Sequence, residues 1–143
     1  MYKGAIMGEW RLRNPSSWTM FIFGVLAFLL GIIGLIQPEL TLQILGFEVL
    51  DREARAAGDF TVLFLTASSM ASTNMGAYYV ILALREVRLF FWITVPFRML
   101  TFTIFTLAVV NGVAPQGFLG VGLWELIGAL ATGAALLYER RRA

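Results

Sequence analysis

The chain has 143 residues, of which 59% are hydrophobic and 14% are charged, with a mean hydropathy of +0.78 and a net charge of +2. Soluble domains are about 45–50% apolar and about 25% charged, so this composition is typical of a membrane protein. The absence of cysteine and histidine excludes disulfides, thiol nucleophiles and Cys- or His-bound metal, iron–sulfur and haem sites. We therefore expect no metal and no cofactor, and the placement of the basic residues near span ends argues against nucleic-acid binding.

Four apolar segments are long enough to cross a bilayer, which takes about 20 residues. They are residues 18–36, 60–84, 89–110 and 118–138. The first lacks a small-x-small cleavage site, which favours a retained span over a signal peptide. We predict an all-α polytopic membrane protein, with residues 1–143 forming one antiparallel four-helix bundle. The connection 85–88 is so short that the second and third helices are expected to be antiparallel neighbours.

Residues 39–59, between the first two spans, are acidic but too apolar for a free loop. They are expected to lie along the membrane surface as an interfacial segment, with Asp51 capping a short helix that runs through Ala57. Two interpretations are open for this segment: a simple interfacial connector, or a lid over the mouth of a cavity.

The first span carries a stripe of small residues, a pattern that favours close helix contact and would also suit self-association. The stripe consists of Gly24, Ala27, Gly31 and Gly34.

Lysine and arginine are distributed unevenly over the two sides of this four-span topology. One side has only Arg52 and Arg55. The other side holds Lys3, Arg11, Arg13, Arg85, Arg88, Arg140, Arg141 and Arg142. The positive-inside rule therefore predicts that both termini are cytoplasmic, in a multi-pass protein of the bacterial inner (plasma) membrane.

One arginine and one glutamate lie inside the predicted spans, and charges at that depth need a partner or a water-filled cavity. They are Arg98 in the third span and Glu125 in the fourth. Asn74 and Arg98 each lie about a dozen residues from the turn at 85–88, or roughly 18 Å along the helices, so they are expected to be level. Glu125 lies roughly 9 Å from Arg98 along the axis, a gap that two long side chains can partly close.

Two interpretations of this polar cluster are open. In the structural one, Asn74, Arg98 and Glu125 form a buried ion pair and hydrogen-bond latch that specifies which helices pack. In the functional one, they line a cavity that holds a mostly apolar molecule with one polar end. The ligand-binding residues in that case are Asn74, Arg98, Glu125, Thr73, Tyr78 and Thr101.

Several short motifs resemble small bacterial four-helix membrane proteins of the DoxX-like kind. They are Gly31-x-x-Gly34, Gln37-Pro38-Glu39-Leu40, Leu45-Gly46-Phe47, Asn74 with Tyr78-Tyr79, Pro96-Phe97-Arg98, and Gly117-Phe118 followed by Glu125. The resemblance implies a four-helix bundle in the inner membrane and supplies no substrate, cofactor or catalytic residue.

Three functions remain in competition. The first is binding of a hydrophobic or lipid-like molecule, or service as an accessory subunit of a larger membrane complex. The second is a membrane isomerase or hydrolase with Glu125 as acid or base and Arg98 as electrostatic stabiliser, the two catalytic candidates. The third is a small dimeric exporter, although a fixed Arg98 partner would deprive it of a free Glu125. The expected partners are membrane lipid, a hydrophobic small molecule, and a second copy of the chain or a larger membrane complex.

Overall fold

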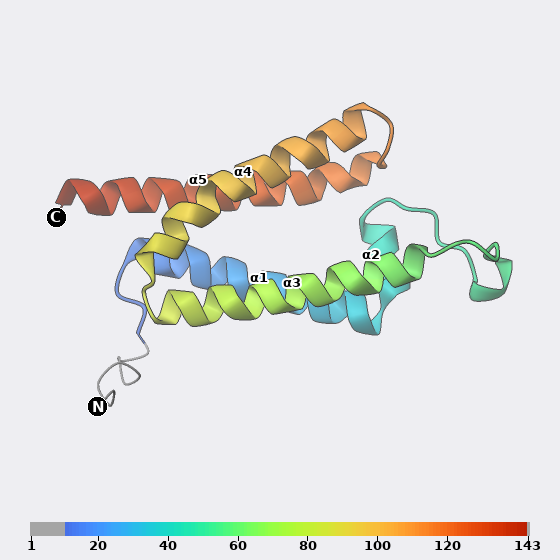
Figure 1. The fold of residues 1–143 in the computed structure, drawn as a ribbon, viewed down its shortest axis with the longest axis horizontal. Coiled ribbons are helices and arrows are strands. Elements are labelled where there is room, and N and C mark those ends of the chain that lie inside the picture. Colours follow the sequence, from blue (N-terminus) through green and yellow to red (C-terminus); the bar gives the residue numbers. More distant parts are fainter. Residues whose placement is uncertain (1–10, 143) are drawn as a thin grey trace.

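The computed structural model describes residues 11–142, and every regular element in this range is a helix (Figure 1). The long helices α1 (Pro15–Ile36), α3 (Thr61–Leu84), α4 (Arg88–Val110) and α5 (Leu119–Arg142) lie over the four predicted segments. The short helix α2 (Pro38–Ile44) follows α1, and single 3-10 turns form η1 (Arg52–Ala54) and η2 (Gln116–Phe118). Lys3, which contributed to the predicted orientation, lies outside the described residues.

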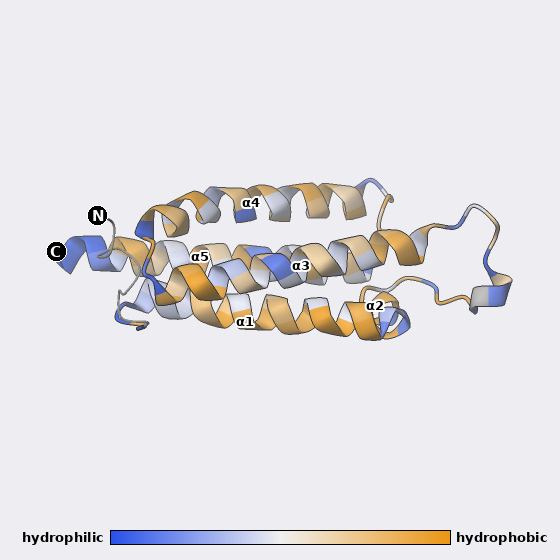
Figure 2. Ribbon diagram, turned by 60° about the horizontal axis from the view of Figure 1, so that its bottom comes forward, coloured by the Kyte–Doolittle hydropathy of each residue, from blue (hydrophilic) through white to orange (hydrophobic). Residues whose placement is uncertain are grey.

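Three helices are long and apolar enough to cross a membrane: α1, α4 and the segment Gln116–Arg142 that contains α5. The hydrophobic colour runs along most of α1, and hydrophilic residues gather at the end of α5 (Figure 2). Helix α3 has 24 residues but is not among the three, because serine, threonine and asparagine residues in its middle lower its hydropathy. The prediction of a membrane protein is thus supported by three helices rather than four.

Helices α1 and α3 pack against each other along their length, in opposite directions. The contact depends on small residues, since a Cβ on Gly24 would lie 2.9 Å from the backbone nitrogen of Val80. Further along, a Cβ on Gly31 would meet the Thr73 nitrogen at 2.6 Å. Ser72 also donates a 2.9 Å hydrogen bond across the contact to the carbonyl of Ala27. The glycine stripe of α1 is therefore used inside the chain and is not free for self-association.

Helix α4 packs mainly against α5, and α5 also packs against α1. We expected α3 and α4 to be packed neighbours, but they contact each other mainly near their connecting turn and then diverge (Figure 1). Large aromatic side chains fill the space beside this turn: the rings of Tyr79 and Phe90 are 5.4 Å apart, and Phe91 is fully buried. The short turn therefore keeps only the connected ends of α3 and α4 together, and the two helices do not pack along their length.

Two glutamates meet the first turn of α1 at the end of the molecule that holds the α3–α4 turn. Glu139 of α5 accepts hydrogen bonds from the backbone nitrogen of Ser16 at 2.7 Å and from its hydroxyl at 3.0 Å, and it pairs with Arg88. Glu86, whose φ is 50°, accepts a 3.0 Å hydrogen bond from the Asn14 side chain. Carboxylates are favourable here because helix N-termini carry unpaired N–H groups and a partial positive charge.

The connection between α1 and α3 differs in detail from the expected interfacial segment. The short helix predicted to run from Asp51 through Ala57 is only the single turn η1, and the Asp51 side chain makes no capping hydrogen bond. A regular helix instead forms earlier, at α2, where Pro38 occupies the first turn and its fixed φ suits that position.

The contact between α1 and α3 yields a stability prediction for Gly76→Ala. A Cβ at this position would lie 2.7 Å from the Gly24 carbonyl oxygen and also against the backbone of Phe28, and neither group can rotate away. We expect a loss of about 1–3 kcal/mol, typical of overpacking, measured as unfolding free energy in detergent. Gly120→Ala is the matched control, because a Cβ there meets nothing within 4 Å. Equal stability of both variants would contradict this packing.

Candidate functional site

The structure brings together the arginine and the glutamate that lie within the long helices. Arg98 on α4 donates from Nε to Oε2 of Glu125 on α5 at 3.1 Å. Arg98 is only 2% exposed, whereas the Glu125 side chain retains partial exposure. Because arginine keeps its charge in proteins, this carboxylate is the counter-charge that makes the burial of Arg98 tolerable.

The Arg98 guanidinium is enclosed by groups from two further positions. Its Cζ lies 3.3 Å from the ring centroid of Phe23 on α1, a cation–π contact that is worth about 2 kcal/mol when desolvated. The Phe23 ring also stacks with Trp124 of α5, with the centroids 4.8 Å apart. On α5, Gly128 leaves the space that Nη2 of Arg98 occupies, since a Cβ there would overlap this nitrogen. One side chain of α4 is thereby held by both α1 and α5.

This enclosure leaves part of the guanidinium unsatisfied. Nη1 and Nη2 of Arg98 are buried and have no hydrogen-bond partner in residues 11–142. Two neighbouring hydroxyls bond to each other and not to Arg98: Thr94 on α4 donates to the Tyr79 oxygen on α3 at 3.2 Å. The only helix-to-helix hydrogen bond of Arg98 in the described chain is the one to Glu125.

The remaining predicted site residues lie elsewhere. Asn74 and Tyr78 are exposed on α3, and Asn74 does not hydrogen-bond to Arg98. Thr73 is buried against α1 and donates to the carbonyl of Ser69 in its own helix at 2.9 Å. Thr101 likewise donates within α4, to Phe97 at 3.0 Å. The predicted six-residue cluster is thus reduced in space to the Arg98–Glu125 pair.

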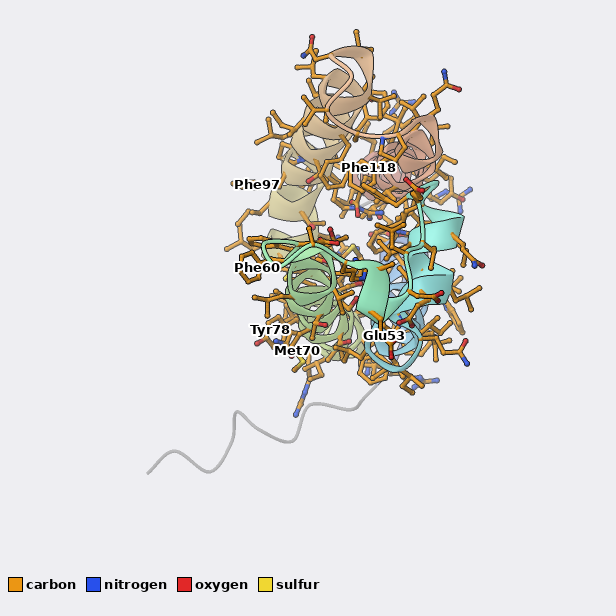
Figure 3. All side chains as sticks on the ribbon, turned by 90° about the vertical axis from the view of Figure 1, so that its right-hand side faces the viewer. Glu53, Phe60, Met70, Tyr78, Phe97 and Phe118 are labelled. Carbon is orange, nitrogen blue, oxygen red and sulfur yellow. The ribbon has the colours of Figure 1, made fainter. Side chains whose placement is uncertain are left out.

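A pocket of about 390 Å³ lies between α2, the start of α3 and η2, at the opposite end from the contact between the start of α1 and the end of α5. Figure 3 views the molecule from this end, with Phe118 and Phe60 labelled. Neither Arg98 nor Glu125 lines the pocket. The lining is mostly apolar and consists of Leu42, Leu45, Phe47, Thr61, Phe64, Leu65, Ser68 and Phe118.

The two hydroxyls of the pocket already have hydrogen-bond acceptors. Ser68 donates to the carbonyl of Leu65 at 2.9 Å, and Thr61 donates to the Asp59 carboxylate from both its hydroxyl and its backbone nitrogen. These hydrogen bonds from Thr61, together with Arg55, lower the pKa of Asp59. Arg55 donates from Nη1 to Asp59 at 2.9 Å, and its Nε and Nη2 are buried without a partner in the described residues.

Comparisons of the chain with protein-family models, curated protein sequences and solved structures gave no match. The resemblance to DoxX-like proteins therefore stays a prediction.

Sequence reasoning missed several residues that the structure places around Arg98 or at the pocket. Gly128 carried a usable signal, because it follows Glu125 by one helical turn and leaves room for a partner on the same face. Phe23 carried none, since its contact with Arg98 depends on how α1 and α4 are rotated. Pocket residues such as Leu42 and Phe118 are far apart in the chain and look like ordinary apolar positions.

A double-mutant cycle tests whether Arg98 and Glu125 form a structural latch. Removing one partner of a buried ion pair costs about 3–5 kcal/mol because it leaves an uncompensated charge or acceptor. We expect Arg98→Met and Glu125→Gln each to lower the unfolding free energy, and the double variant to recover most of the loss. Thr103→Val, which removes an exposed hydroxyl bonded within α4, is the control and should be nearly neutral. Additive losses in the double variant would contradict a latch.

Gly128→Ala tests the same site from the side of the glycine. The new methyl group would occupy the position of Arg98 Nη2, so the guanidinium would have to leave Glu125 or α5 would have to move. We expect a loss of about 1–3 kcal/mol of unfolding free energy. Gly133→Ala, also on α5, is the matched control, because its Cβ would make ordinary contact with Val95 at 3.6 Å. If Gly128→Ala were additionally neutral in an Arg98→Met background, its effect would be assigned to the guanidinium.

Proposed function

We propose that this chain is a four-helix integral membrane protein that holds a hydrophobic or lipid-like molecule. The membrane placement of α3 is supported by its packing against α1. Because Gly24, Gly31 and Gly34 of α1 bring α3 into backbone contact between Ser69 and Val80, a membrane that α1 crosses must also surround this part of α3. Serine and threonine tolerate this position because they bond to nearby backbone carbonyls.

The proposed orientation has both termini on the cytoplasmic side of a bacterial inner membrane. It is supported by the hydrogen bonds that bring the start of α1, the α3–α4 turn and the end of α5 to one end of the molecule. Most of the arginines of the described residues belong to these three segments, whereas Arg52 and Arg55 belong to the connection at the other end. This asymmetry is the one that the positive-inside rule relates to the cytoplasmic side.

The observation that carries ligand binding is the apolar pocket between α2, α3 and η2. Its volume of about 390 Å³ lies within the range of roughly 300–1,000 Å³ found for small-molecule sites. The two hydroxyls in the pocket already have hydrogen-bond acceptors. An apolar chain that fills the pocket would therefore bury few unpaired polar groups, which keeps the cost of desolvation low.

The polar end of the ligand is suggested by the charged pair beside the pocket. Thr61 lines the pocket and bonds to Asp59, which in turn pairs with Arg55. This pair presents a charged carboxylate and a guanidinium at the edge of an otherwise apolar pocket, where a polar group of a ligand can be hydrogen-bonded. A molecule with an apolar chain and one polar end matches both features.

The alternatives receive less support from the geometry. A membrane enzyme or a dimeric exporter would need Glu125 as a free acid–base group, but Arg98 bonds to its carboxylate. An accessory role in a larger complex stays a prediction.

Filling the pocket tests the proposed function. Ser68→Trp places an indole in the space that a lipid chain would occupy, and we expect at least a several-fold reduction in the lipid or fatty acid retained after purification, measured by mass spectrometry. Leu63→Trp is the control, because Leu63 is exposed on the same part of α3 and does not line the pocket. Equal retention by the two folded variants would contradict a ligand in this pocket.

A further inference from the structure

The feature that points beyond ligand binding is the outer face of α3, and in particular Asn74. Several hydroxyls on the same helix have acceptors: Thr66 donates to Val62, Ser72 donates to Ala27, and Thr73 donates to Ser69. Asn74 is exposed near the middle of α3 and makes no hydrogen bond within the described chain. An amide has two donor hydrogens and an acceptor oxygen, and helix carbonyls cannot satisfy all of them.

The direction of Asn74 follows from the residues that face α1. Helical residues are about 100° apart, so Ser72 and Gly76, two positions before and after Asn74, point to the opposite side of α3. Both lie at the α1 contact, where Ser72 bonds to Ala27 and Gly76 abuts Phe28. Asn74 is therefore aimed away from α1. Tyr78, one turn further along the helix, is 53% exposed, and its position on α3 is labelled in Figure 3.

In the proposed membrane placement of α3, on which this inference rests, Asn74 would face hydrocarbon at mid-depth. An unpaired amide in that environment is costly, and interhelical hydrogen bonds between asparagines are a common way to satisfy it. The outward faces of α1 and α5 carry mainly apolar side chains, so they need no such partner. Only α3 combines mid-helix exposure with an unpaired amide in the described helices.

We infer that the outer face of α3 binds the same face of a second copy of this chain. In a dimer with a two-fold axis along the membrane normal, each residue faces its own copy at the same depth. A different partner protein would need its own hydrogen-bonding group at the depth of Asn74. The amide is self-complementary: each Asn74 can donate from Nδ2 to Oδ1 of the other. Ala67, Ala71, Asn74 and Tyr78 are all exposed and follow the 4-3-4 spacing of a helix-pairing seam.

The absence of cysteine from the chain allows a direct test by disulfide cross-linking. Disulfides form only when the two Cα atoms come within about 7 Å, so a cysteine on the proposed seam reports a specific contact. In native membranes we expect Ala71→Cys to cross-link into a covalent dimer. Leu130→Cys, on the exposed face of α5, is the matched control and should remain monomeric. Equal cross-linking of the two variants, or none of Ala71→Cys, would overturn the inference.

Asn74→Leu tests the amide itself. We expect the dimer formed by the purified full chain in detergent to dissociate at least about tenfold more readily, in line with losing a pair of interhelical hydrogen bonds. Thr103→Leu, an equally outward polar-to-apolar change on α4, should leave the dimer unchanged. If Asn74→Leu does not fold, Asn74→Gln in the Ala71→Cys background provides the same readout, with reduced cross-linking expected because the longer amide alters the pairing.

The outcomes separate this inference from the proposed function. A purified wild-type chain that stays monomeric at high density in the bilayer would overturn the dimer. A monomeric chain that instead cross-links through Asn74 to a different membrane protein would overturn it as well. If lipid retention still depended on Ser68 in that case, the pocket proposal would stand alone. If Ala71→Cys cross-linked but Ser68→Trp left lipid retention unchanged, only the pocket proposal would fail.

Discussion

The close approach of α1 and α3 is the constraint on which the rest of the structure depends. Glycines on α1 allow the backbones of the two helices to come so close that a Cβ on Gly24 or Gly31 would clash with backbone atoms of α3. This contact fixes the axial position and rotation of α3 against α1, although α3 has too low a hydropathy to count among the three helices that could cross a membrane. The outward direction of Asn74 follows from this contact. So does the position of the pocket residues on α3, which are Thr61, Phe64, Leu65 and Ser68.

The polar groups of the interior act mainly as connections between helices. Arg98 joins α4 to α5 through Glu125 and to α1 through the ring of Phe23. At one end of the molecule, Glu139 joins α5 to the start of α1. Such connections add more to the specificity of helix packing than to net stability, because desolvation offsets much of their attraction. Since the buried charges are used in this way, we assign the proposed ligand to the apolar pocket and the proposed second copy to the outer face of α3.

The number of residues along a helix predicted how far along it each polar side chain lies, but not the side of the helix to which that side chain points. Glu125 was expected beside Arg98 because it is the only acid in the long apolar segments, and the structure does pair them. Asn74 was expected there because it lies at the same depth, yet it points away from α1 and from Arg98. Depth depends on the constant rise of a helix, whereas direction depends on which face a neighbouring helix covers. The short α3–α4 turn misled in the same way, since adjacency in the chain did not produce packing.

The sequence by itself determined the composition class, the ranges of the four long helices and the identity of the buried acid–base pair. These features depend on local apolar runs and on the scarcity of charge within them, which one chain displays without any partner. Only the tertiary structure decided that α1 packs on α3, that Phe23 and Gly128 enclose Arg98, and that a pocket lies between α2, α3 and η2. These features depend on the rotation and pairing of helices, which are set by contacts between residues far apart in the chain.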